Sequence, residues 1–66
     1  MPKDLRSPYE IAYHRAFPGA RMTHAQIVDE FRRVTGSTSR RMMRKLLKKG
    51  RDYAIRKLCE AHEIYP

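Results

Sequence analysis

The fold is decided by the stretch Ser39-Arg-Arg-Met-Met-Arg-Lys-Leu-Leu-Lys-Lys49, in which pairs of basic residues alternate with pairs of large apolar ones. At about 100° per residue, an α-helix places the two Met-Leu pairs on one side and the cations on the other. A strand has a period of two, so it would put one Met and one Leu on each face. We therefore predict an amphipathic helix over 39–49, with one face for a core and the other for anions. The predicted core residues are Met42, Met43, Leu46 and Leu47.

The charge of the chain is concentrated in the same region. The net charge is +8 and the pI is near 10.3. Residues 40–57 hold nine basic residues against Asp52 alone, whereas the rest of the chain carries six basic and six acidic residues. An ordinary solvated surface mixes the two signs, so a block of one sign favours an anion-binding face. Nucleic acid, an acidic protein and an anionic membrane are the partner classes that fit.

Before this stretch, two helices are predicted from their capping residues. Ser7 can cap, Pro8 suits a first helical position and Glu10 completes a capping box, which predicts a helix over 8–17. Its apolar residues recur at helical spacing, and we interpret the stripe as core rather than as a surface for base stacking. The stripe consists of Tyr9, Ala12, Tyr13, Ala16 and Phe17.

The second helix is predicted over 24–35. Thr23 and Gln26 form its capping pair, and Met22 can pack onto Ile27 at its entry. Gly36 is a natural C-terminal stop. Its predicted inner face consists of Ile27, Val28, Phe31 and Val34.

The phase of the apolar pattern changes near Gly50. Continuing the helical wheel of 39–49 would put Lys57 on the apolar side and Ile55 on the basic side. Restarting at Asp52 instead gathers one apolar arc, so we predict a break near Gly50, Asp52 as a cap and a fourth helix over 53–63. The arc consists of Ala54, Ile55, Leu58, Cys59, Ala61 and His62. The fold class predicted is all-α: a small four-helix domain over 7–66, after a flexible N-terminal arm over 1–6.

Metal, cofactor and catalytic signatures are lacking in the sequence. Cys59 and His62 stand at i and i+3, but a structural zinc site needs two further ligands with suitable spacing. The carboxylates are scattered and no glycine-rich phosphate loop is present. We therefore predict no metal, no cofactor and no enzymatic activity.

Location is predicted from what the chain lacks. The lone cysteine excludes an internal disulfide, and the N-terminal residues contain no apolar run typical of a signal peptide. No window approaches the roughly 20 apolar residues of a membrane span. We expect a cytoplasmic, nucleoid or nuclear protein rather than a secreted one.

Residues 23–49 are predicted as a helix, a glycine-containing turn and a basic helix. This order resembles the helix-turn-helix of DNA-binding proteins, over 27 of the 66 residues and at the level of architecture. The resemblance implies that the second helix enters a major groove. On chemical grounds, arginines can bind guanine edges or phosphates, lysines bind phosphates, and hydroxyls at a helix N-terminus suit a phosphate. The candidate binding residues are Ser37, Thr38, Ser39, Arg40, Arg41, Arg44, Lys45, Lys48, Lys49 and Arg51.

Three functional hypotheses are compatible with this surface. The leading one is a duplex-DNA-binding regulator or architectural factor, which would gain affinity by forming a homodimer. The alternative is an inhibitor or adaptor whose basic face binds an acidic protein such as a polymerase. The third is binding to RNA or to an anionic membrane surface.

Overall fold

The computed structural model describes residues 7–66, and within them it contains four α-helices and no strand. They are α1 (Pro8–Ala16), α2 (His24–Thr35), α3 (Arg40–Lys48) and α4 (Arg51–Ala61). The prediction of a small all-α domain of four helices is confirmed, whereas the N-terminal arm predicted over 1–6 lies outside the described residues. Among these helices, none is long and apolar enough to cross a membrane.

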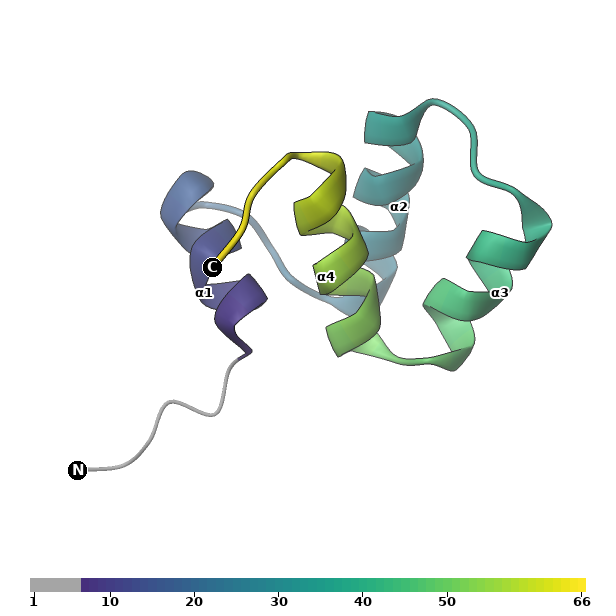
Figure 1. Ribbon diagram of the computed structural model, residues 1–66, viewed down its shortest axis with the longest axis horizontal. Coiled ribbons are helices and arrows are strands. Elements are labelled where there is room, and N and C mark those ends of the chain that lie inside the picture. Colours follow the sequence, from purple (N-terminus) through teal and green to yellow (C-terminus); the bar gives the residue numbers. More distant parts are fainter. Residues whose placement is uncertain (1–6) are drawn as a thin grey trace.

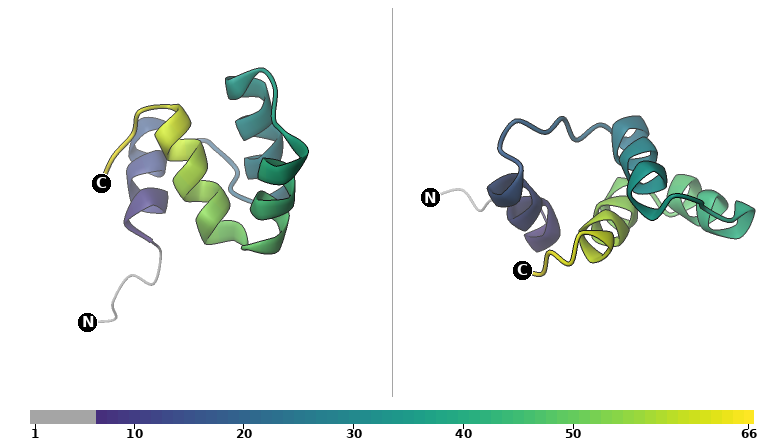
Figure 2. Two further views of the ribbon diagram at one scale, coloured as in Figure 1. Left: turned by 45° about the vertical axis from the view of Figure 1, so that its right-hand side comes forward. Right: turned by 90° about the horizontal axis from the view of Figure 1, so that it is seen from above.

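Helix α4 is the centre of the arrangement. It packs on α1, on α2 and on α3, and its contact with α2 is the most extensive (Figure 1). Helices α1 and α3 consequently lie at opposite ends of the molecule, and two further views agree (Figure 2). One side of α3 therefore faces the domain and the rest of it faces outward.

Three of the four predicted helix starts are confirmed by their caps. The Ser7 hydroxyl accepts a hydrogen bond from the backbone N–H of Glu10 at 3.2 Å. The Thr23 hydroxyl accepts from the backbone N–H of Gln26 at 3.3 Å and donates to its side-chain oxygen at 2.8 Å. The Ser39 hydroxyl accepts from the backbone N–H of Met42 at 3.1 Å. In each helix, the bond accepted by the hydroxyl satisfies a backbone N–H that the first helical turn leaves unpaired.

The fourth start differs from the prediction in its cap. The break near Gly50 is present, but α4 begins at Arg51 and its N-cap is Gly50, without a side-chain cap. Gly50 has φ 97°, a conformation that glycine adopts at little cost and that turns the chain sharply between α3 and α4. Asp52, predicted as the cap, lies in the first turn, where its charge favours the positive end of the helix dipole.

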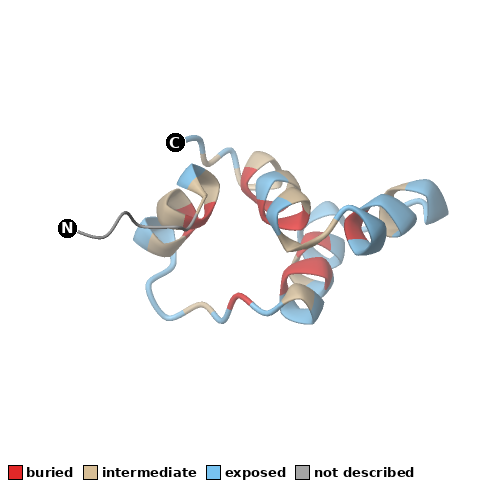
Figure 3. Cartoon of the chain, turned by 90° about the horizontal axis from the view of Figure 1, so that it is seen from below, coloured by how far each residue is buried: buried red, intermediate tan, exposed pale blue. Residues whose placement is uncertain are grey.

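The core lies between α2, α3 and α4, with α1 covering the other side of α4 (Figure 3). Four residues of the predicted α4 arc are buried, namely Ala54, Ile55, Leu58 and Cys59. The other two, Ala61 and His62, are only partly buried. From α2, Ile27, Val28 and Phe31 are buried as predicted, and Met22 packs at its entry. From α3, Leu46 alone is fully buried, with Met42 and Met43 partly buried beside it.

Four residues predicted as core are exposed, because each lies at the margin of a packed face: Ala16, Phe17, Val34 and Leu47. Ala16 is the last residue of α1. Leu47 is 59% exposed, since α3 is at the edge of the domain and only the arc centred on Leu46 is covered. Val34 is 37% exposed in the last turn of α2. Phe17 is 40% exposed and follows α1 rather than belonging to it, although its ring packs 5.0 Å from that of Tyr13.

The C-terminal end of α4 closes in a Schellman motif. The N–H of Ile64 donates to the carbonyl of Cys59 at 2.8 Å, and the N–H of Glu63 donates to that of Glu60 at 3.1 Å. Glu63 takes the left-handed conformation that the motif requires, with φ 58°. Ile64 thereby returns to pack on the core, whereas Tyr65 is exposed. The helix ends two residues before the predicted boundary because the chain reverses here.

Candidate nucleic-acid interface

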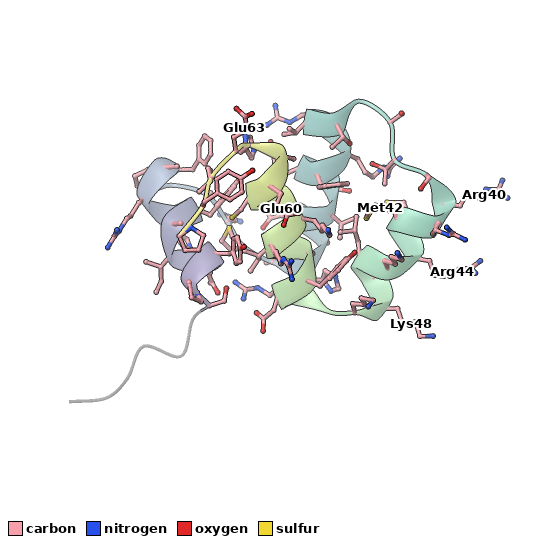
Figure 4. All side chains as sticks on the ribbon, viewed as in Figure 1. Arg40, Met42, Arg44, Lys48, Glu60 and Glu63 are labelled. Carbon is pink, nitrogen blue, oxygen red and sulfur yellow. The ribbon has the colours of Figure 1, made fainter. Side chains whose placement is uncertain are left out.

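Six cations form what we call the α3 basic face. All six are exposed, and none of them forms an ion pair with a carboxylate in the described part of the chain. Arg40, Arg44 and Lys48 follow one another at intervals of four and point away from the other helices, whereas Met42 points toward them (Figure 4). The face consists of Arg40, Arg41, Arg44, Lys45, Lys48 and Lys49.

The basic face is not flat. Five of its side chains line an open hollow of about 590 Å³, and long charged side chains of this kind present both apolar stems and polar ends to a ligand. Such a hollow presents several donors to one ligand. The five residues are Arg41, Arg44, Lys45, Lys48 and Lys49.

The turn before α3 uses its hydroxyls within the fold. The Thr35 hydroxyl donates its proton to the carbonyl of Phe31 at 2.8 Å. The Thr38 hydroxyl lies 3.2 Å from the Thr35 hydroxyl and must therefore be the donor in that bond, because a hydroxyl has one proton to donate. The Ser39 hydroxyl caps α3, as described above. Of the three hydroxyls predicted to bind phosphate, Ser37 alone has no hydrogen bond among the described residues, and it is exposed. Thr38 and Ser39 therefore shape the turn.

Arg51, predicted as a binding residue, is engaged elsewhere. Its two terminal nitrogens donate to the two carboxylate oxygens of Glu10 at 3.1 and 2.7 Å, and its Nε donates to the Met22 carbonyl at 2.6 Å. The carboxylate is buried, and the paired guanidinium has its pKa raised, chiefly by the hydrogen bonds to that carboxylate. Arg51 thus joins α4 to α1 and to the loop before α2.

A contact that sequence reasoning missed fixes the orientation of α3. The Nε2 of His24, in the first turn of α2, lies 2.8 Å from the carbonyl oxygen of Leu46. Since a carbonyl only accepts, the imidazole must donate from Nε2. This bond ties the end of α3 to the start of α2, and nothing in the local pattern of either residue indicates it.

Cys59 and His62 both pack against residues of α1 and the loop that follows it. The Cys59 thiol donates to the Tyr9 carbonyl at 3.3 Å, and burial raises the pKa of this thiol to about 11. The His62 ring packs 5.0 Å from Phe17 and 5.8 Å from Tyr13. Within residues 7–66, no group of three or more His, Cys, Asp and Glu side chains converges as metal ligands would.

None of the ion pairs among residues 7–66 involves a residue of the α3 basic face. Glu10 pairs with Arg51, Glu30 pairs with Arg33, and Glu60 pairs with both Arg56 and Lys57. These pairs join residues of α1, α2 and α4, whereas the cations of the α3 basic face have none within residues 7–66. The chain matches no family model, no curated protein and no solved structure.

Proposed function

We propose that the protein binds duplex DNA through the α3 basic face and acts as a regulator or architectural factor. One observation carries the proposal: the six cations of α3 and its C-cap are all exposed and have no carboxylate partner among residues 7–66. When unpaired lysines and arginines bind the phosphates of duplex DNA, they release the counterions condensed on the DNA. This release is a main source of affinity for DNA.

The dimensions of α3 support a duplex as the ligand. A helix with its side chains is about 10–12 Å wide, and the major groove of B-DNA is about 12 Å wide. Because α3 lies at one end of the molecule, a groove can receive its outer side without meeting α1 (Figure 1). The helix-turn-helix resemblance of residues 23–49 points to the same mode of docking.

The chemistry of the face divides into two tasks. Arg40, Arg41 and Arg44 carry planar, forked donors that fit guanine edges or bridge two phosphates. Lys45, Lys48 and Lys49 are point charges suited to the phosphate backbone. Helix α3 contains no Asn or Gln, the residues that recognise adenine. We therefore infer that phosphate contacts dominate.

The test removes the three arginines together. The logarithm of the binding constant falls linearly with the logarithm of the salt concentration, by about 0.9 for each phosphate contact. If each arginine contacts one phosphate, the triple Ala variant of Arg40, Arg41 and Arg44 lowers the magnitude of this log–log slope by about 2.7. That is a roughly 500-fold loss of affinity at 0.1 M salt. The helical circular-dichroism signal stays unchanged because alanine favours helix and the three side chains are exposed.

A matched control separates the face from net charge. The triple Ala variant of Arg15, Arg21 and Arg33 removes the same charge from exposed positions outside α3. We expect it to bind far more tightly than the α3 variant. Equal affinities of the two variants would show that the protein attracts DNA only through its overall charge.

A further inference from the structure

The Tyr53 ring, in the first turn of α4, has two lysine ammonium groups beside it. The Nζ of Lys49, which ends the α3 basic face, lies 5.5 Å from the ring centroid, and so does the Nζ of Lys57. The two Nζ atoms are therefore at most about 11 Å apart. Cations are attracted to the negative face of an aromatic ring. Tyr53 thus holds one cation from each of two helices in one neighbourhood.

This cluster extends the positive surface past the end of α3. Lys49 lines the hollow of the α3 basic face, and it also lies beside Tyr53. Lys57 follows Tyr53 by one helical turn on α4. Lys49 and Lys57 thus bring one cation from the end of α3 and one from α4 beside the same ring.

The charge of Lys57 is partly engaged by a neighbouring carboxylate. Its Nζ donates to Glu60 at 3.3 Å, and the Nε of Arg56 donates to the other carboxylate oxygen at 3.4 Å. These bonds, with that from Lys57 the stronger, lower the pKa of the Glu60 carboxyl, so Glu60 is ionised at neutral pH. Both bonds are long and lie near the surface, where such ion pairs are weak. A phosphate can replace the carboxylate as acceptor.

We propose that Lys57, held near Lys49 by the Tyr53 ring, is a further phosphate contact of the duplex-binding surface, for which Glu60 competes. The inference rests on the proposed function and places part of the interface on α4. It gives the duplex a backbone contact beside the groove that α3 enters. Lys57 contacts the ligand itself, whereas Tyr53 is a positioning residue.

The first test is Lys57→Gln, measured by fluorescence anisotropy of a labelled mixed-sequence duplex across a salt series. Loss of one phosphate contact lowers the magnitude of the log–log slope by about 0.9 and weakens binding about eightfold at 0.1 M salt. Arg15→Gln is the control, because it removes the same charge from an exposed position on α1 at the far end of the molecule. Identical slopes for the two variants would overturn the inference.

The second test removes the competitor. Glu60→Gln frees Lys57 and is expected to tighten duplex binding several-fold. Glu63→Gln is the control, because it removes the same charge from an exposed position three residues further along. If the two variants tighten binding equally, Glu60 acts only through long-range charge and the proposed competition is wrong.

The third test isolates the ring. Tyr53→Phe keeps the aromatic face and should leave the log–log salt slope unchanged. Tyr53→Leu keeps apolar bulk but loses that face, so it should lower the magnitude of the slope. Equal slopes would contradict the positioning role. These outcomes remain distinct from failure of the proposed function, in which the wild-type protein shows no duplex binding that depends on α3.

Discussion

The Arg51–Glu10 pair gives a prediction that separates a structural role from a binding role. Replacing Arg51 by Ala removes two hydrogen bonds to the buried Glu10 carboxylate and one to the Met22 carbonyl. Losing one partner of a fully buried ion pair costs about 3–5 kcal/mol, and an exposed pair is worth below about 1 kcal/mol.

The Arg51 side chain is 38% exposed and the Glu10 side chain is 8% exposed, so this pair lies between those limits. We expect Arg51→Ala to lower the free energy of unfolding by about 2–3 kcal/mol. A chain of this length has a total stability of about 3–10 kcal/mol, so the loss is a large fraction of it.

The assay is urea unfolding followed by circular dichroism at 222 nm. Lys48→Ala is the control, since it removes an exposed cation of the α3 basic face and should leave stability unchanged. Arg51→Lys keeps the charge but not the fork, so it should fall between Arg51→Ala and the wild type. The reasoning is refuted if Arg51→Ala unfolds within 0.5 kcal/mol (roughly the scatter for surface substitutions) of the wild type while its duplex affinity falls.

Three further predictions concern the core and the end of α4. Leu46→Ala should destabilise the domain by about 2–5 kcal/mol and exposed Leu47→Ala by less than about 0.5 kcal/mol, and equal losses in urea unfolding would contradict the burial described here. Glu63→Gly should stabilise by about 0.5–1 kcal/mol because glycine adopts positive φ without strain, and a melting temperature no higher than that of Glu63→Ala would contradict this. The raised pKa of the Cys59 thiol favours its neutral form in the folded state. Its contribution to the free energy of unfolding is therefore complete below pH about 9 and is lost toward pH about 11. The stability difference between the wild type and Cys59→Ala should accordingly shrink over that range, and a constant difference would show that the thiol does not titrate with unfolding.

The sequence predicts the helices well because the signals for them are local. Ser7, Thr23 and Ser39 each cap a backbone donor three residues away, and the shift of apolar phase at Gly50 follows from neighbouring residues. Periodicity also predicts which side of a helix is apolar. It does not predict how wide an arc the neighbouring helices cover, which is why Leu47 was wrongly assigned to the core with Leu46.

The roles of charged and polar residues depend on contacts that are distant in sequence. Arg51 stands in a block of cations, and only the fold brings it to Glu10, 41 positions earlier. The bond from His24 to the Leu46 carbonyl spans 22 positions. A one-sign charge block therefore predicts where an anion-binding surface lies, but not which members of the block the fold uses for itself.

The central claim is that the α3 basic face binds duplex DNA. Fluorescence anisotropy with a mixed-sequence duplex, a single-stranded RNA and an acidic polypeptide, across a salt series, tests it most directly. We predict a preference for the duplex and a log–log slope of about −5.4 to −6.3, which corresponds to six or seven phosphate contacts. Weak and equal binding of the three polyanions would contradict the claim and would favour an acidic protein partner instead.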